Sequence, residues 1–138
     1  MRIAKEFTWE MSHRLPYHEG NCKNIHGHSY KLQIALEGEP NDQGMLIDFY
    51  HIEAIVRPLI NQLDHTFIVD RDDKLMLDFL VGNGFRHFVI DDYTTCENIS
   101  LFFAGYFKNE FAKFDNIKKI GIRVFETIDT YAETEVYL

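Results

Sequence analysis

The stretch Asn21–Tyr30 (NCKNIHGHSY) places two histidines on either side of one glycine. In a strand, residues i and i+2 point to the same face, so His26 and His28 can direct both imidazoles at one point. His13 follows an earlier predicted strand, and pairing of the two strands as a hairpin would bring it to the same end. Three histidines without a fourth strong ligand are typical of a catalytic zinc site. The alternative is that all three are surface or turn histidines.

Cys22 lies four residues before His26 and is flanked by polar residues. A nearby Zn²⁺ or imidazolium makes a thiol more acidic, which would turn Cys22 into a usable base or nucleophile. The alternative is a small apolar residue in a loop, which the polar flanks disfavour. The second cysteine, Cys96, lies at a predicted helix start, and we expect it to be buried and inert.

Two further positions carry acids in unusual places. Asp64 precedes His65 just past a predicted helix, and a carboxylate can fix a histidine's tautomer for proton transfer. Alternatively, His65 is a histidine at a helix end that interacts with the helix dipole. On the evidence of this pair alone, that alternative is favoured. Glu126 continues the apolar face of the predicted strand Lys118–Thr127, so it either binds something or pairs with a cation. Two adjacent N–H donors on a ring edge would suit it, and a surface glutamate is the alternative.

The elements that must position these residues follow from periodicity. Alternation of apolar and polar residues predicts four strands, at Arg2–Trp9, Ser29–Glu37, Lys118–Thr127 and Tyr131–Leu138. Helical spacing predicts an amphipathic helix over Asp48–Leu63, which Pro58 should kink or divide. A second helix should start near Thr94 or Thr95, with Thr94 and Glu97 as a capping box.

Strands at both ends with helices between them predict an α+β fold, with an antiparallel sheet and helices on one face. The order is β-β-α-α-β-β, a sheet of four strands with two helices. Asn-Gly within Leu80–Phe85 suggests a hairpin in a longer segment between the helices.

The chain has 138 residues, which predicts one domain over residues 1–138. The formal net charge of −8 argues against a nucleic-acid partner. We see neither a secretory signal nor an apolar run long enough to span a membrane, so no membrane role is expected. With two cysteines far apart in the sequence, a cytoplasmic location without a disulfide framework is expected.

Taken together, these motifs resemble the 6-pyruvoyltetrahydropterin synthase / 6-carboxytetrahydropterin synthase family of T-fold pterin enzymes. The resemblance covers nearly the whole chain. It rests on His13 after the first strand and on CKNIHGHSYKL (Cys22–Leu32), LIDF (Leu46–Phe49), LDH (Leu63–His65), TCENIS (Thr95–Ser100) and VFET (Val124–Thr127).

The resemblance implies a role for each matching residue. It implies Zn²⁺ ligands at His13, His26 and His28. It implies catalytic roles for Cys22, Asp64 and His65, a pterin anchor at Glu126, and further substrate contacts at Glu97 and Thr95. It also implies 7,8-dihydroneopterin triphosphate as substrate and a homohexamer of two stacked trimers with active sites at subunit interfaces.

The spacing of Cys22 before the H-G-H stretch resembles the bacterial 6-carboxytetrahydropterin synthases, which act on the path to 7-deazaguanine, the queuosine precursor. A pyruvoyl-type synthase that only eliminates triphosphate, and a zinc-stabilised binding protein without turnover, are the other two hypotheses. Two departures from the family bear on substrate scope. Tyr93-Thr94 stands where the family commonly has a proline before its threonine, and Asp70–Asp92 is longer and more apolar than the family leads us to expect.

Overall fold

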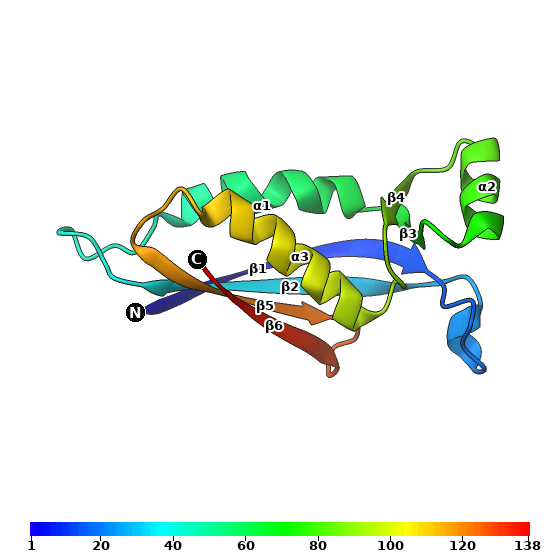
Figure 1. The fold of residues 1–138 in the computed structure, drawn as a ribbon, viewed down its shortest axis with the longest axis horizontal. Coiled ribbons are helices and arrows are strands. Elements are labelled where there is room, and N and C mark those ends of the chain that lie inside the picture. The colour runs from blue at the N-terminus through cyan, green and yellow to red at the C-terminus, as the bar shows by residue number, and fades with distance from the viewer.

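The computed structural model describes residues 1–138 and consists of one sheet with three α-helices (Figure 1). The sheet has six strands in the order β4-β3-β1-β2-β5-β6. The strands are β1 (Arg2–His13), β2 (His26–Gly38), β3 (Thr66–Asp70), β4 (His87–Ile90), β5 (Ile117–Phe125) and β6 (Tyr131–Tyr137). The helices are α1 (Phe49–Leu63), α2 (Lys74–Gly82) and α3 (Cys96–Phe111), with a short 3₁₀ helix η1 at Asn21–Lys23.

The long hairpin of β1 and β2 is the frame of the molecule. The two strands pair antiparallel from Arg2 opposite Glu37 to His13 opposite His26. This register sets Trp9 against Tyr30, whose rings stack with centroids 5.4 Å apart. Since side chains alternate between faces, every second residue of both strands enters the core. The hairpin pairing predicted from the sequence is therefore confirmed.

The core lies between this sheet and the two helices α1 and α3, which cover the same face (Figure 1). From α1 it receives Ile52, Val56, Leu59, Ile60 and Leu63, and from α3 Ile99, Phe103, Phe107 and Phe111. Pro58 does not divide α1, contrary to that part of the expectation. Pro58 and Ala54 both lie on the exposed side of the helix, so water can take the Ala54 carbonyl that Pro58 leaves without a donor.

The α+β class is confirmed, but the four-stranded antiparallel sheet with two helices is wrong in detail. Strands β1, β2, β5 and β6 do form the expected antiparallel part. Strands β3 and β4 extend it, running parallel to β1 and to each other. Ser12 pairs with Phe67, which places Phe67 on the face opposite α1 and α3. There it packs with Met76 and Leu80 of α2, so not all helices lie on one face.

The hairpin expected at Leu80–Phe85 is also wrong, because Asn-Gly here ends a helix. Gly84 has a φ of +69° and its N–H bonds to the Val81 carbonyl, while the Phe85 N–H bonds to the Leu80 carbonyl. This pair of bonds is the Schellman motif, in which a glycine in the left-handed region closes a helix. An Asn-Gly pair serves a hairpin turn or a helix end equally well, and the parallel pairing of β3 and β4 decides between them.

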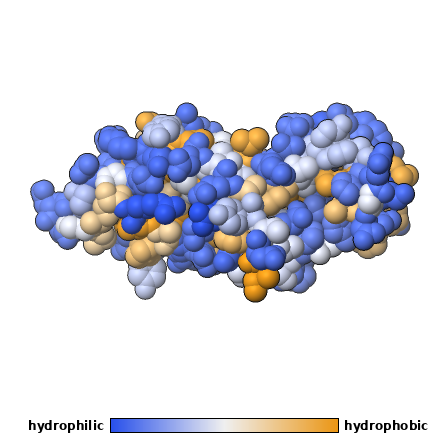
Figure 2. Space-filling view, turned by 90° about the horizontal axis from the view of Figure 1, so that it is seen from below, coloured by the Kyte–Doolittle hydropathy of each residue, from blue (hydrophilic) through white to orange (hydrophobic).

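The surface is predominantly polar. Figure 2 shows the molecule from below, and hydrophilic residues cover most of this face, with hydrophobic ones in separate patches. None of the helices has the length and apolar character needed to cross a membrane.

Candidate active site

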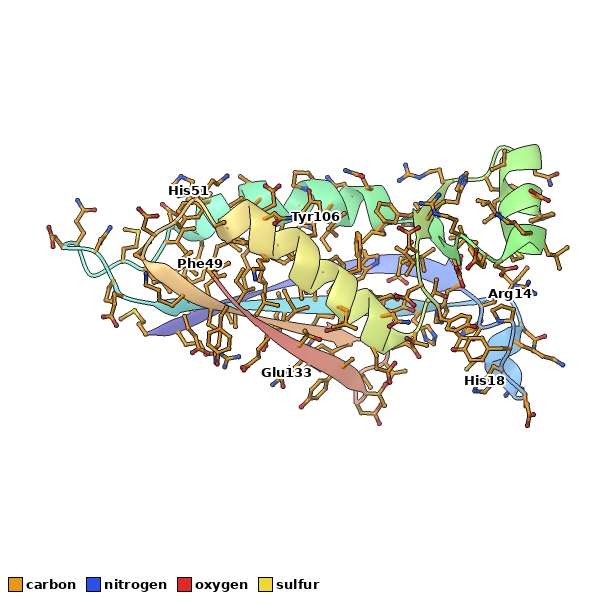
Figure 3. The ribbon with its side chains drawn as sticks, in the orientation of Figure 1. Arg14, His18, Phe49, His51, Tyr106 and Glu133 are labelled. Carbon is orange, nitrogen blue, oxygen red and sulfur yellow. The ribbon has the colours of Figure 1, made fainter.

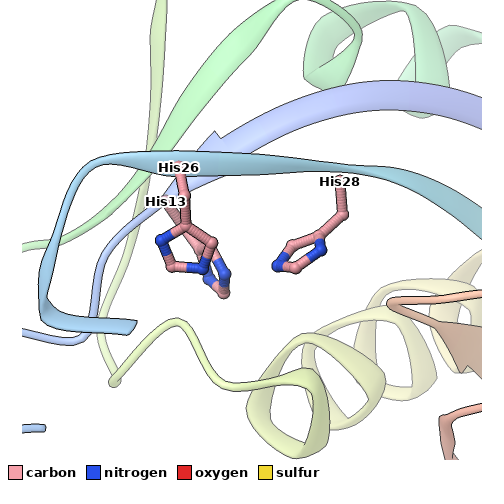
Figure 4. A group of neighbouring side chains, drawn as sticks. All are labelled: His13, His26 and His28. Carbon is pink, nitrogen blue, oxygen red and sulfur yellow. The ribbon is translucent and has the colours of Figure 1, made fainter. Parts of the chain in front are cut away.

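Three histidines meet at the end of the β1–β2 hairpin (Figure 4). His13 is the last residue of β1 and lies directly opposite His26, the first residue of β2. His28 follows two residues later, so its side chain shares the face of His26. Each histidine offers one ring nitrogen, and these three atoms lie within 4.8 Å of one another. The convergence expected from the sequence is thus present on the helix-covered face.

Backbone carbonyls orient two of the rings. His13 Nδ1 lies 2.7 Å from the Thr94 carbonyl oxygen, and His26 Nδ1 lies 2.7 Å from that of Asn24. A carbonyl only accepts, so both rings carry their proton on Nδ1 and leave Nε2 with a free lone pair. Nε2 of His26 and of His28 are buried and make no hydrogen bond. Buried nitrogens without partners, aimed at one point, fit a bound metal ion.

Burial also favours the neutral form of His13 and of His28. His13 is 1% exposed, and desolvation by burial lowers its pKa to about 4, against a raising effect of the hydrogen bond to Thr94. Positive charge on His26 or His28 would lower it further. Desolvation lowers the pKa of His28 as well, opposed by the charge of Glu126. Neutral imidazole is the form that ligates a metal, so the site is prepared for one at neutral pH.

Glu126 faces the cluster from the end of β5. Its Oε1 lies 3.6 Å from His28 Nε2, and its Oε2 lies 4.0 Å from His13 Nε2. It forms no ion pair with a lysine or arginine. A cavity of about 540 Å³ borders it, lined also by His28, Lys31 and Phe125. Glu126 therefore lies beside the histidine cluster.

Cys22 lies in η1, within the loop that links β1 to β2, and is half-buried with a free thiol. The pKa of the buried Tyr30 hydroxyl is raised, first by desolvation and then by the negative charges of Glu126, Cys96 and Cys22. Cys22 therefore shares the electrostatic environment of the cluster. Cys96 donates its S–H to the Val124 carbonyl, and burial raises its pKa to about 11, which agrees with an inert thiol.

Asp64 and His65 form the expected pair, with His65 Nδ1 3.0 Å from Asp64 Oδ2. The Glu10 N–H donates to Asp64 Oδ1 at 2.9 Å, and this bond is the main reason that the pKa of Asp64 is lowered. His65 has a φ of +56°, a conformation that few non-glycine residues adopt. Its N–H bonds to the Glu10 carbonyl, which locks the turn onto the edge of β1.

The pair does not meet the histidine cluster within one chain. The His65 side chain is 76% exposed and makes no contact with the three clustered rings. It lines a cavity of about 620 Å³ together with Glu10, Ser12 and Ser29, whose side chains stand on the sheet face opposite the cluster. His28 borders both this cavity and the one beside Glu126, at the end of the hairpin.

At the start of α3 the structure corrects one detail of the sequence analysis. The helix is capped by Thr95, whose hydroxyl accepts from the Asn98 N–H, and not by Thr94 with Glu97. Thr94 instead donates its hydroxyl to the Arg14 carbonyl and holds His13 through its own carbonyl. Sequence reasoning missed this role, because a contact to a backbone carbonyl leaves no residue-type signal. Glu97 is exposed in the first turn of α3.

Comparison with known proteins agrees with this architecture. The family model described as 6-pyruvoyl tetrahydropterin synthase matches residues 2–136. The chain belongs to this family. It is 32% identical over 140 residues to a 6-carboxy-5,6,7,8-tetrahydropterin synthase of Haemophilus influenzae, covering 96% of both chains. A protein of the same name from Aquifex aeolicus is 29% identical over 154 residues, covering 95% of both.

Similar folds occur among solved structures. A 6-pyruvoyltetrahydropterin synthase of Plasmodium vivax superposes with a TM-score of 0.81 at 19% identity, covering 100% of this chain and 98% of that one. A protein of Wolinella succinogenes, WS1659, gives a TM-score of 0.82 at 23% identity, covering 99% and 97%. At these identities the likeness establishes the fold alone.

Proposed function

We propose that this protein is a zinc-dependent 6-carboxy-5,6,7,8-tetrahydropterin synthase. It would convert 7,8-dihydroneopterin triphosphate and water to 6-carboxytetrahydropterin, acetaldehyde and triphosphate, a carbon–carbon lyase reaction in 7-deazaguanine (queuosine precursor) biosynthesis. The observation that carries the proposal is the convergence of His13, His26 and His28 opposite Glu126. It occurs in a chain whose nearly full-length relatives bear this name.

The three imidazoles fit Zn²⁺, because the site offers neutral nitrogen donors and no thiolate that would close it. Bound there, zinc would supply Lewis acidity toward the side-chain hydroxyls of the substrate. The protein's own contribution is orientation. The carbonyls of Thr94 and Asn24 hold two of the rings by Nδ1, so Nε2 stays directed at the site.

Glu126 would bind the pterin ring edge, since one carboxylate can accept from two adjacent N–H donors. A ring held there lies against the histidine cluster, because Glu126 Oε1 is only 3.6 Å from His28 Nε2. Thr95 and Glu97, at the start of α3, are proposed as further substrate contacts. Lys31 lines the same cavity as Glu126 and can attract the triphosphate, despite the net charge of −8.

Cys22 and His65 would move the protons. Cys22 would move a proton as thiolate and thiol, taking it from the side-chain carbon next to the pterin ring or delivering one to the pterin C6. His65, oriented by Asp64, would exchange a proton with a hydroxyl on the opposite side of the substrate. These roles require both groups at one substrate, yet His65 stands on the other face of the sheet from the cluster.

A homohexamer of two stacked trimers would resolve this separation, because His65 of one subunit could reach the cluster of another. The sheet supports such an assembly. Strand β3 pairs with β1 only at Met11 and Ser12, and β6 has no partner on its outer edge. Unpaired strand edges are sites where another chain can add its own strand.

The test is to incubate zinc-loaded protein with 7,8-dihydroneopterin triphosphate and to identify the products by mass spectrometry. The proposal expects 6-carboxytetrahydropterin with acetaldehyde. A 6-pyruvoyl product that keeps all side-chain carbons would make the protein a pyruvoyl-type synthase. Recovery of unreacted substrate from zinc-replete protein would leave a zinc- and pterin-binding protein without turnover.

A further inference from the structure

The segment that departs most from the sequence expectation, Asp70–Asp92, makes a buried contact with the metal-ligand strand. Asp73 accepts two hydrogen bonds from the Arg14 guanidinium, Nε to Oδ2 at 2.8 Å and Nη2 to Oδ1 at 2.6 Å. The Asp73 side chain is 5% exposed and that of Arg14 is 18% exposed. Figure 3 shows Arg14 at the end of β1, on the side of α2. Arg14 directly follows His13, so this ion pair acts next to a candidate ligand.

The same carboxylate also caps α2. Asp73 is the N-cap of α2, and its Oδ1 accepts from the Met76 N–H at 3.3 Å. Two of its three bonds join the start of α2 to Arg14, just after β1, and the third caps the helix. From the other end of the segment, the Thr94 hydroxyl donates to the Arg14 carbonyl at 3.2 Å, and the Thr94 carbonyl holds His13. Three contacts therefore hold His13 and Arg14. The Arg14 guanidinium bonds to Asp73, and the Arg14 carbonyl and the His13 ring both bond to Thr94.

Arg86, which belongs to the segment, contacts the other half of the candidate site. Arg86 Nη2 donates to the carbonyls of Asn61 and Asp64, each at 3.2 Å. The carbonyl of Asp64 belongs to the peptide bond that leads into His65, whose backbone is in the left-handed region. A charged donor on both carbonyls stabilises the end of α1 and holds this turn in place.

We propose that the Asp70–Asp92 segment positions two residues of the candidate site: Asp73 positions His13 through Arg14, and Arg86 positions His65. This inference rests on the proposed function, since it gives these contacts a role in zinc binding and proton transfer. A bidentate pair that is largely buried resists rearrangement, because removing one partner leaves the other charge desolvated. Arg14 is thereby held by Asp73 and not directed at a triphosphate.

The test of the Asp73 contact compares Asp73→Asn with Asp91→Asn. Asp91 forms an ion pair with Arg71 in the same segment, but it is 79% exposed, so it controls for loss of a carboxylate. Zinc affinity would be measured by chelator competition, and site geometry by the visible absorption of the Co²⁺ form. Outer partners of metal ligands typically contribute 10–100-fold in affinity. We expect Asp73→Asn to weaken zinc binding about 10-fold and to alter the Co²⁺ spectrum, and Asp91→Asn to change neither.

Arg14→Lys keeps the fold-stabilising charge but loses the bidentate geometry, so it serves if Asp73→Asn fails to fold. We expect it to weaken zinc binding several-fold with the same spectral change. For the Arg86 contact, Arg86→Gln should lower kcat about 10-fold and leave zinc affinity unchanged. Equal zinc affinity in wild type, Asp73→Asn and Arg14→Lys would overturn the positioning role of the segment while leaving the proposed function intact. A wild-type protein that binds no zinc would overturn both.

Discussion

The two halves of the candidate site differ in almost every physical respect. The histidine cluster is enclosed by the helix-covered face, with His13 1% exposed and two ring nitrogens without partners. The Asp64–His65 pair stands on the edge of β1 with the His65 side chain 76% exposed. The three histidines converge within one chain, whereas His65 faces an open cavity on the other side of the sheet.

Loss of a ligand should have the largest effect on the enclosed half. His26→Ala removes one of three donors, and we expect zinc affinity to fall by more than the 10–100-fold that an outer partner contributes. His51→Ala, an exposed histidine in α1, is the matched control and should bind zinc as wild type does. Chelator competition measures both. Unchanged affinity in His26→Ala would remove it from the ligand set.

Replacing the Cys22 thiol should show whether zinc binding and catalysis depend on different residues. We expect Cys22→Ser to retain zinc and lose at least 100-fold in kcat, because a hydroxyl is a far poorer base than a thiolate. Cys96→Ser keeps the donor to the Val124 carbonyl and should retain nearly full turnover. Rate measurements at saturating substrate decide this. Comparable rates for the two variants would exclude Cys22 as the catalytic base.

Burial of His13 should also make the stability of the metal-free protein depend on pH. The pKa of His13 is lowered on folding from 6.5 to about 4, so the unfolded chain binds a proton more readily between these values. Stability is then full above about pH 6.5 and is lost as pH falls toward 4. At 1.36 kcal/mol per pH unit, the loss is about 3 kcal/mol. Denaturant unfolding of the metal-free protein over this range measures it, and a His13→Gln variant with the wild-type slope would contradict the assignment.

The smallest effect is expected at Thr95, which lies outside both halves. Thr95→Ala removes the N-cap of α3 and should lower the free energy of unfolding by about 1 kcal/mol. Thr95→Ser keeps the capping oxygen and should stay within about 0.5 kcal/mol of wild type. Urea titration of the three proteins gives the comparison. Equal losses for both variants would mean that the methyl group, not the cap, carries the contribution.

The sequence predicts the enclosed half well because its geometry is local. His26 and His28 share a face by strand periodicity, and a hairpin must bring His13 to the same end. Alternating segments and amphipathic helices likewise identify the antiparallel strands and the core helices.

The Asp70–Asp92 segment escapes prediction for a physical reason. Strand β3 is buried on both faces, so it shows no alternation, and its parallel pairing with β4 depends on residues that are distant in the chain. The Asp73–Arg14 bond spans 59 positions, and no local pattern marks it. Similarly, the placement of His65 on the opposite face follows from the pairing of Ser12 with Phe67, which only the folded sheet reveals.

We propose that the two halves meet between subunits, and mixing two inactive variants is the most direct test. His28→Ala lacks the cluster and His65→Ala lacks the Asp64–His65 pair, so each alone should be inactive. If the variants are refolded together in equal amounts, random assembly gives intact pairs at about one site in four. We expect the mixture to recover about a quarter of wild-type activity. Mixed oligomers that form, verified by mass spectrometry, and yet show no recovered activity would contradict it and place both halves within one chain.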